Sequence, residues 1–302
     1  MSSLATIRRW LTQHAKHGDV SQEFKRPRRP VRWVNRATHE HRWLRKPIAY
    51  IIGTQPFCGW SFISKAPILI PRWETEEWLH KISTEMIFPR ISPNTPLRVI
   101  DFCSGSGCIG LSLLGSFLTI FGGSPKNIAI QLIDIDPKAM ALAAENIRSL
   151  QRQMKVDFVN HTPIDLQTVD LLSERDVQIG LNLQFCKSME TPMDVWIGNP
   201  PYIPTAAINL LPRSVRSWES AQALDGLCTE GIHIHKAIIS RVHGLSKHSK
   251  MWILVLEIGG DHQRKPLAQY ISGLFGASAV PSFHTDSSGK TRILVLQPIS
   301  SL

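Results

Sequence analysis

The stretch that decides the fold is Asp194-Val195-Trp196-Ile197-Gly198-Asn199-Pro200-Pro201-Tyr202. Its first half is an apolar run, which predicts a buried β-strand. Pro200 and Pro201 donate no backbone N–H and cannot continue a central strand, so the strand must end before them. The turn then presents the Asn199 side chain, the Pro200 carbonyl and the Tyr202 ring from one stiff segment. Two acceptors beside a flat ring suit a planar amide or amine; a proline-rich loop after an edge strand is the alternative.

Two upstream segments have the same strand pattern and end in residues suited to a nucleotide-like ligand. Leu97–Asp101 is an apolar strand, and the Cys103–Gly110 loop after it has the G-x-G-x-x-G spacing ahead of an apolar helix. Such a loop lets the backbone approach a ligand at a helix N-terminus, and dinucleotide and S-adenosylmethionine sites both use it. Ile128–Ile133 is the next strand. Asp134, at its tip, lies where a carboxylate can accept both hydroxyls of a ribose.

The remaining pattern alternates helices with strands. Asp136 is an expected N-cap with Pro137 at the first helical position. Val156–Val159 is an expected third strand, and residues 160–193 an expected insertion with at most one short helix. Further expected elements are helices at Lys138–Leu150, Ile232–Val242 and Gln263–Phe275, and strands at Trp252–Ile258, Ala279–Phe283 and Arg292–Gln297. This order predicts an α/β fold with a mostly parallel sheet, helices on both faces and an antiparallel terminal pair.

The segment before the first of these strands predicts a hairpin followed by a helix. Tyr50–Ile52 and Trp60–Ile63 have strand composition and flank a turn region that runs from Gly53 to Gly59. Thr75 is an expected cap of the following helix, whose apolar face carries Trp78, Leu79 and Ile82.

The composition is that of a globular protein, and it locates the positive charge. Of 302 residues, 43% are hydrophobic and 19% charged, enough for a buried core. No apolar run approaches the roughly 20 residues of a spanning helix, so we expect no membrane anchor. Five scattered cysteines without a Cys-x-x-Cys pair favour a reducing compartment over a disulfide framework or a zinc site. Of the net charge of +10, +9 belongs to residues 1–46, which hold twelve Lys and Arg against three acidic residues.

This basic N-terminus has its own interpretation. Residues 1–17 contain no acid, and Leu4, Ile7 and Leu11 fall at helical spacing beside arginines. An amphipathic, arginine-bearing, acid-free segment is typical of a mitochondrial presequence. The alternatives are the first helix of a small helical domain or a tail for acidic partners. Residues 25–30 follow as a basic linker broken by prolines.

These motifs together resemble the HemK/PrmC protein-(glutamine-N5) methyltransferases, which modify the Gly-Gly-Gln loop of peptide-chain release factors. The resemblance covers residues 46–297, and LIPR-x-ETE separates this family from other Asn-Pro-Pro-Tyr methyltransferases. Because Trp73 stands in that run, the sequence LIPRWETE is similar to that of the fungal mitochondrial branch of the family. The runs that carry the resemblance are KPIAYIIG (46–53), the F-x-G-x-x-F run Phe57–Phe62, LIPRWETE (69–76), DFCSGSGCIGLSL (101–113), DIDPKAMALAAENI (134–147), IGNPPYIP (197–204), ALDGL (223–227) and LEIGGDHQ (256–263).

The resemblance implies a Rossmann-like class I methyltransferase with a seven-stranded sheet, S-adenosylmethionine as methyl donor and no metal. The implied catalytic residues are Asn199, Pro200 and Tyr202. The implied cofactor-binding residues are Cys103, Ser104, Gly105, Ser106, Gly107, Asp134 and Asn199. The implied substrate-binding residues are Arg72, Glu74, Asn199, Pro200, Pro201 and Tyr202.

The resemblance also implies a partner and a domain arrangement. The acceptor would be the glutamine of a mitochondrial peptide chain release factor in the matrix, methylated by a monomer that contacts neither nucleic acid nor membrane. Residues 1–46 would be a basic N-terminal segment, residues 47–80 a hairpin and linker helix, and residues 81–302 the methyltransferase domain. Because only about 46 residues precede the shared region, the family's helical N-terminal domain would be reduced here.

One position departs from the family pattern. The family carries an Asp/Glu-aromatic pair after the third strand, near the adenine, and Asn160-His161-Thr162 fills that place here. Asp165 is the substitute that we expect to contact the adenine.

Three other functions fit part of the pattern. An amino-methyltransferase of the adenine N6 type uses the same turn, but residues 47–302 carry a net charge of only +1 and no Lys/Arg stripe for phosphates. A nicotinamide oxidoreductase explains the glycine loop and Asp134, yet leaves the Asn199 turn unexplained. A non-catalytic scaffold has no need of the intact loop, Asp134 and Asn199.

Overall fold

The computed structural model describes residues 36, 39–92, 94–121, 124–176 and 192–299. The predicted presequence and the predicted linker lie outside the described residues. Near the end of the basic segment, residues 39–44 are helical, and Glu40 pairs with both Arg36 and Lys46 at 2.8 Å.

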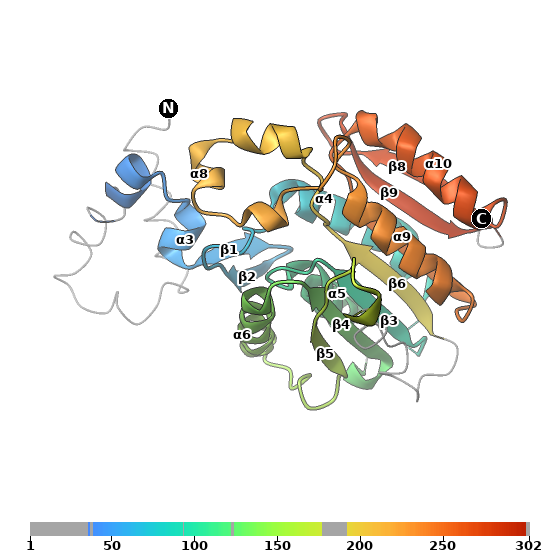
Figure 1. Cartoon of the computed structure of the whole chain (residues 1–302). Helices are drawn as coiled ribbons and strands as arrows, with labels where there is room; N and C mark the ends of the chain where they lie inside the picture. Colours follow the sequence, from blue (N-terminus) through green and yellow to red (C-terminus); the bar gives the residue numbers. More distant parts are fainter. Residues whose placement is uncertain (1–35, 37–38, 93, 122–123, 177–191, 300–302) are drawn as a thin grey trace.

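Seven strands form one sheet in the order β5-β4-β3-β6-β7-β9-β8 (Figure 1). The strands from β5 to β7 run parallel, whereas β9 pairs antiparallel with β7 and with β8. The predicted α/β fold, with a mostly parallel sheet and an antiparallel terminal pair, is confirmed. The strands are β3 (Leu97–Phe102), β4 (Ile128–Asp134), β5 (Ile164–Thr168), β6 (Met193–Gly198), β7 (Met251–Glu257), β8 (Ala279–Thr285) and β9 (Thr291–Pro298).

Helices cover both faces because the central strands are apolar on both sides. Every residue of β6 is buried: Val195 and Ile197 face one core, and Trp196 faces the other. The first core holds α4, α5 and α6, and the second holds α9 and α10. The longer helices are α4 (Trp73–Ile82), α5 (Cys108–Phe121), α6 (Pro137–Met154), α9 (His233–Ser246) and α10 (Arg264–Phe275). Shorter turns are α8 (Arg213–Arg216), η2 (Ser83–Ile87), η3 (Phe88–Arg90), η4 (Pro125–Asn127), η6 (Thr205–Leu210), η7 (Ala221–Ala223) and η8 (Asp261–Gln263).

The predicted hairpin is present, but its first strand begins later than expected. β1 (Thr54–Phe57) pairs with β2 (Trp60–Ile63), and β2 lies beside α6 (Figure 1). The prediction of a strand at Tyr50–Ile52 is wrong, because those residues belong to helix α3 (Ile48–Ile52). Gly53 ends that helix at a φ of +89°, a left-handed conformation that strand composition alone does not reveal.

Two further local predictions are wrong. The third strand is β5, not Val156–Val159, because α6 continues to Met154 and the chain turns before it enters the sheet. β5 also lies within the stretch that we expected to be an insertion, of which residues 177–191 are not described. Thr75 does not cap α4: the helix begins at Trp73, and the Thr75 hydroxyl points to Glu257 instead. Asp136 does cap α6, accepting from the Lys138 N–H at 2.8 Å.

Candidate active site

Three strand ends meet at one edge of the sheet. Phe102 of β3 is paired with Ile133 of β4 on one side and with Gly198 of β6 on the other. The loop after β3, Asp134 and Asn199 therefore follow their strands at the same level. In open α/β sheets this carboxyl edge is where ligands bind.

A cavity opens at this edge and receives most of the expected site residues. Those that line it are Arg72, Cys103, Ser104, Gly105, Ser106, Asp134, Asn199 and Pro201. Four expected residues lie outside the lining: Glu74, Gly107, Pro200 and Tyr202. Sequence reasoning missed further lining residues, including Ile68–Pro71, Thr75, Asp170–Leu172, Ser220, Gln222, Ala223, Asp225 and Leu227.

The glycine loop is held open by unusual backbone angles and by one carboxylate. Gly105 and Gly107 have φ of +55° and +78°, and Cys103 also lies in the left-handed region at +54°. The Gly105 N–H donates to Asp134 Oδ2 at 2.8 Å, and the Asp136 N–H donates to Asp134 Oδ1 at 3.0 Å. Asp134 thereby fixes the loop after β3 to the end of β4. Each of its oxygens keeps a second lone pair for a ligand hydroxyl.

A second carboxylate lies beneath the loop. Asp101 is fully buried; its Oδ2 accepts from the Gly110 N–H at 2.9 Å, and its Oδ1 has no partner among the described residues. Burial raises the pKa of Asp101 to about 8, with a smaller contribution from nearby Asp134. Burial also raises the pKa of Asp134. Gly110 is required here, since a Cβ would lie 2.8 Å from Leu132 and 3.2 Å from Asp101.

The residues that follow β5 line the cavity, whereas Asn160-His161-Thr162 and Asp165, which we considered for the adenine, do not. Asp134 pairs with Thr168, and the Val169 N–H donates to the Asp134 carbonyl at 2.9 Å. Val169 and Asp170 therefore line the cavity next to Asp134. Asn160-His161-Thr162 precede β5, and so lie at the opposite end of the strand.

Asp165, which we expected to contact the adenine, is not among the residues that line the cavity. It lies within β5, where its carboxylate accepts from the Gln131 side chain at 2.7 Å. The alternation of Ile164 and Leu166 with polar residues is the signal that identifies the true strand.

The turn after β6 presents Asn199 to the cavity but turns Tyr202 away from it. The Tyr202 ring packs against Gly259, where an added Cβ would lie 3.2 Å from the ring. The Tyr202 hydroxyl forms a hydrogen bond with the side chain of Glu257. Burial raises the pKa of Tyr202. Pro200 is buried and lies outside the cavity lining, and among the described residues no backbone donor reaches its carbonyl. The turn thus presents Asn199 to the cavity, and the Tyr202 ring lies outside the lining.

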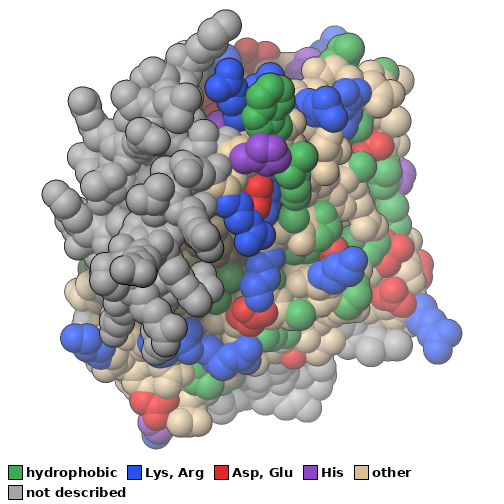
Figure 2. All heavy atoms as spheres, turned by 90° about the vertical axis from the view of Figure 1, so that its left-hand side faces the viewer, with side chains coloured by type: hydrophobic (Ala, Val, Ile, Leu, Met, Phe, Trp, Pro, Cys, Tyr) green, Lys and Arg blue, Asp and Glu red, His purple; other side chains and the backbone are tan. Residues whose placement is uncertain are grey.

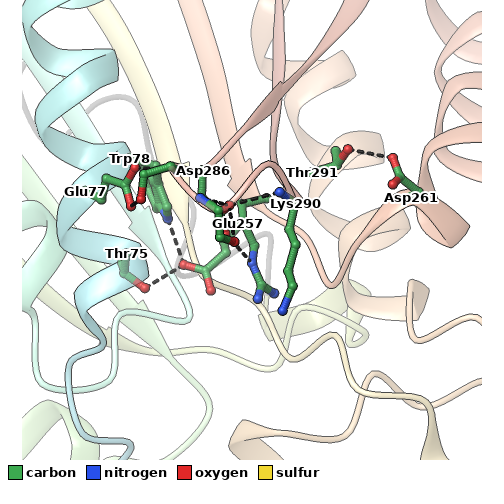
Figure 3. A network of polar contacts seen from close by, with 11 residues as sticks. Thr75, Glu77, Trp78, Glu257, Asp261, Asp286, Lys290 and Thr291 are labelled. Carbon is green, nitrogen blue, oxygen red and sulfur yellow. Dashed lines mark hydrogen bonds and ion pairs between the residues drawn. The ribbon is translucent and has the colours of Figure 1, made fainter.

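Next to Asn199 lies a buried polar network, of which Figure 3 shows Thr75, Trp78 and Glu257. Asn199 Nδ2 donates to Thr75 Oγ1 at 3.3 Å, and Thr75 donates to Glu257 Oε2 at 2.5 Å. Trp78 Nε1 donates to the same oxygen at 2.7 Å. Burial raises the pKa of Glu257, while the bonds from Thr75, Trp78 and Tyr202 oppose that rise.

Two segments that line the cavity are held together by an ion pair and a backbone hydrogen bond. Arg72 Nη2 lies 2.5 Å from Glu219 Oε2, and the Glu219 side chain is only 1% exposed. Burial raises the pKa of Glu219 in spite of this pairing. Next to it the Ser220 N–H donates to the Pro67 carbonyl at 2.8 Å. These contacts hold residues 220–227 over the segment 68–72, and both segments line the cavity.

Comparison with known proteins agrees with this geometry. No family model matches the chain. A release factor glutamine methyltransferase from Moorella thermoacetica is 30% identical over 239 residues, which is 78% of this chain and 71% of that protein. The chain belongs to the release factor glutamine methyltransferase family.

Two eukaryotic members of the family are similar at the same level. The human MTRF1L release factor glutamine methyltransferase is 30% identical over 78% of this chain. The probable MRF1 mitochondrial N(5)-glutamine methyltransferase mtq1 of Schizosaccharomyces pombe is 29% identical over 72% of it. The chain spans 65% of the length of each of these two proteins.

Solved structures of the same fold include methyltransferase domains outside this family. The N-terminal domain of human METTL16, in complex with SAH, superposes with a TM-score of 0.52 at 15% identity, covering 93% of this chain and 97% of that chain. The catalytic domain of the same human protein with an RNA hairpin gives a TM-score of 0.51 at 14% identity, covering 87% and 79%. These likenesses establish the class I methyltransferase fold.

Proposed function

We propose that this protein transfers the methyl group of S-adenosylmethionine to the side-chain amide nitrogen, N5, of a glutamine in a mitochondrial peptide chain release factor. The glutamine is that of the Gly-Gly-Gln motif. The observation that carries the proposal is Asn199, which lies in the wall of the same cavity as the glycine loop and Asp134. Family membership supports the acceptor, and the similarity to the probable MRF1 mitochondrial N(5)-glutamine methyltransferase of Schizosaccharomyces pombe supports the mitochondrial factor.

The cavity suits the donor by its chemistry. Asp134 offers carboxylate lone pairs to the ribose hydroxyls, and the loop Cys103–Ser106 brings backbone groups to the methionine end. Ile135, Val169 and Leu171 give the adenine an apolar slot, with Asp170 at its rim. When bound there, S-adenosylmethionine supplies a methyl group on a positively charged sulfur.

The turn suits the acceptor. An amide nitrogen is a poor nucleophile because its lone pair is delocalised into the carbonyl. Asn199 Oδ1 and the Pro200 carbonyl can accept the two amide hydrogens, which aims the lone pair and stabilises the positive charge that develops on nitrogen. No general base is needed, since the nitrogen loses its proton only after it has been methylated. Arg72 and Glu74, on the rim and in α4, are proposed to contact the protein substrate.

The test is methyl transfer to a defined residue. The protein is incubated with labelled S-adenosylmethionine and a mitochondrial release factor, and with the same factor carrying Gln→Ala in its Gly-Gly-Gln motif. We expect label on the native factor only, at the glutamine side chain by mass spectrometry. Equal labelling of the two factors, or of neither, contradicts the proposal.

An RNA and a DNA oligonucleotide serve as competing acceptors in the same assay. On the face in Figure 2 the Lys and Arg side chains of the described residues are interspersed with acidic and hydrophobic ones. Phosphate binding requires an aligned basic surface. We therefore expect no labelled nucleic acid; label there would indicate the base-directed alternative.

The proposed location is the mitochondrial matrix. It rests on the acid-free, arginine-bearing segment at residues 1–17 and on the names of the relatives. No described helix has the length and apolar character needed to cross a bilayer.

Within the described residues no His, Cys, Asp and Glu side chains are grouped to hold a metal ion. Fluorescent fusion of residues 1–46 tests whether this segment directs import.

A further inference from the structure

Asn199, Thr75 and Glu257, from distant parts of the chain, form a line of hydrogen bonds, and Figure 3 shows its Thr75–Glu257 contact. Thr75, on α4, is 2% exposed, and Glu257, at the end of β7, is 1% exposed. Asn199 Nδ2 donates to Thr75 Oγ1 at 3.3 Å, and Thr75 Oγ1 donates to Glu257 Oε2 at 2.5 Å. Neither Thr75 nor Glu257 was singled out by the sequence as part of the site.

The order of donors and acceptors in this line is fixed by chemistry. A carboxylate has no hydrogen, so at the short contact with Glu257 the Thr75 hydroxyl must be the donor. A hydroxyl has only one hydrogen, so Thr75 can only accept from its other neighbour. The group of Asn199 that faces Thr75 must then be the NH₂, and the Asn199 Oδ1 is left to face the cavity.

The surroundings keep Glu257 in the role of acceptor. Trp78 Nε1, which can only donate, lies 2.7 Å from the same Oε2 atom. Tyr202 donates a further hydrogen bond to this carboxylate, and the charge of Arg292 acts on it from the β9 side. Arg292 is itself held by Asp286 at 3.2 Å. An acceptor group surrounded by donors cannot easily exchange roles with Thr75.

We propose that Thr75 and Glu257 are positioning residues that fix the Asn199 amide with its oxygen toward the acceptor glutamine. The inference rests on the proposed function and deepens it. An Asn199 with its amide reversed would present NH₂ to the substrate NH₂, where two donors meet and no hydrogen bond forms. The network therefore selects the one orientation of Asn199 in which the substrate lone pair can be aimed.

The first test removes the link at Thr75. Thr75→Val keeps the volume of the side chain but removes its hydroxyl. Thr75→Ser keeps the hydroxyl. We expect Thr75→Val to lower kcat about 10- to 100-fold, the scale of a misplaced catalytic contact. The KM for the release factor and the Kd of S-adenosylmethionine should stay within about 3-fold, and Thr75→Ser should restore most of kcat. Thr84→Val is the matched control, because Thr84 is exposed and its hydroxyl donates to the carbonyls of His80 and Lys81 in the preceding helix.

The second test changes Glu257. Glu257→Gln keeps an acceptor oxygen for Thr75 and Trp78, so kcat should remain within several-fold of wild type. Glu257→Met removes the acceptor and frees the Thr75 hydrogen to donate to Asn199 Oδ1, so kcat should fall as in Thr75→Val. Thermal unfolding shows which variants fold. Unchanged kcat in folded Thr75→Val or Glu257→Met overturns the proposal, and so does a Thr75→Ser variant as inactive as Thr75→Val.

A third measurement does not depend on the identity of the acceptor. In protein that is deuterated except for its threonine methyl groups and carries labelled asparagine amides, the Asn199 NH₂ protons should show a nuclear Overhauser effect to the Thr75 methyl group. This contact should persist in Glu257→Gln and vanish in Glu257→Met. If wild type fails to methylate the release factor while the contact is present, the proposed function fails and the positioning role stands. If the contact is absent in wild type, the positioning role fails by itself.

Discussion

Arg98 and Asp194 form a buried ion pair that joins β3 to β6, the strand that leads into the Asn199 turn. They face each other across β3 and β6, are 8% and 0% exposed, and form a two-pronged pair, with Nε to Oδ1 at 2.5 Å and Nη2 to Oδ2 at 2.8 Å. A buried charge without its partner is much more costly than the pair is stabilising. The two residues are therefore tightly coupled.

Arg98→Met and Asp194→Leu should each lower the free energy of unfolding by about 3–5 kcal/mol, because each leaves one charge buried alone. The double variant should lose less than the larger single loss, since no charge remains. Urea unfolding of the four proteins measures this coupling. Additive losses would show that the two side chains act independently.

Substitution of Asn199 should lower the rate of methyl transfer, whereas substitution of Asp134 should weaken cofactor binding. Asn199→Ala should lower the rate of methyl transfer by about 10²-fold or more, the scale seen when one charge-stabilising group is lost. Its Kd for S-adenosylmethionine, by calorimetry, should stay within a few-fold. Asp134→Ala should instead weaken cofactor binding about 10- to 100-fold, as expected for lost hydrogen bonds to a charged group. Retained transfer by Asn199→Ala would remove Asn199 from the mechanism.

At the scale of elements, one glutamine joins the three loops at the carboxyl edge. Gln263, the last residue of η8, is fully buried; its Oε1 accepts from the Gly259 N–H at 2.7 Å. Its Nε2 faces the carbonyls of Glu230, Tyr202 and Gly231 at 2.7, 3.0 and 3.1 Å. The turn after β6, the loop before α9 and the end of β7 are thus held by a single side chain. Gly231 packs so closely that a Cβ would lie 2.2 Å from the Tyr202 carbonyl.

Gln263→Glu should be more harmful than Gln263→Met although it is closer in shape. Glu places a negative oxygen against three carbonyls, whereas Met only leaves them unpaired. We expect Gln263→Glu to be less stable than Gln263→Met by about 1–3 kcal/mol, the cost of an unsatisfied buried polar group. Both should lower methyl transfer because the Asn199 turn loosens. Denaturant unfolding measures the stability of the two variants. If Gln263→Glu is the more stable, Gln263 does not hold the three loops together.

For the whole molecule, buried titratable groups should set the limits of stability with pH. His235 is 0% exposed; its Nε2 donates to the Glu257 carbonyl at 2.9 Å, and its Nδ1 has no partner among the described residues. Burial lowers its pKa to about 4. Asp101 has its pKa raised to about 8 by burial. His235 therefore makes the folded state less stable as the pH falls, and Asp101 makes it less stable as the pH rises.

His235 should destabilise the protein in acid. Below the ordinary pKa of about 6.5 the unfolded chain takes up a proton that the folded His235 refuses until about pH 4. Its contribution to stability is therefore lost as pH falls from about 6.5 to 4, by up to about 1.4 kcal/mol per pH unit. His235→Gln should be less stable than wild type at pH 8, and the gap should narrow by pH 5. A constant gap in urea unfolding contradicts this.

Asp101 should destabilise the protein as pH rises. Between about pH 4 and 8 the unfolded carboxyl is ionised while the folded one keeps its proton. Its contribution to stability therefore falls across this window. Asp101→Asn, still able to accept from the Gly110 N–H, should gain stability relative to wild type from pH 5 to pH 8. Thermal unfolding without cofactor at several pH values shows the trend; a pH-independent difference would mean that Asp101 is ionised throughout.

The amino-acid sequence by itself determined the features that depend on neighbouring residues. Pro200 and Pro201 end a strand wherever they occur, and the glycines after β3 permit the left-handed angles that the loop adopts. Asp136 with Pro137 begins a helix for equally local reasons. The parallel sheet followed from the alternation of strands and helices. These signals act over a few residues, which is why they can be read in order along the chain.

Only the tertiary structure decided which distant residues meet. Helix α6 runs past the predicted helix to Met154, and β5 lies in the stretch that we expected to be an insertion, so the cavity-lining residues around Asp170 were not identified. Tyr202 turned away from the cavity because Glu257 and Gly259 offered it a partner and space. Thr75 resembles a helix cap in the sequence, yet it meets a carboxylate 182 positions away. A hydroxyl in a buried site bonds to the acceptor that packing brings within reach, and sheet register, which no local pattern specifies, determines that acceptor.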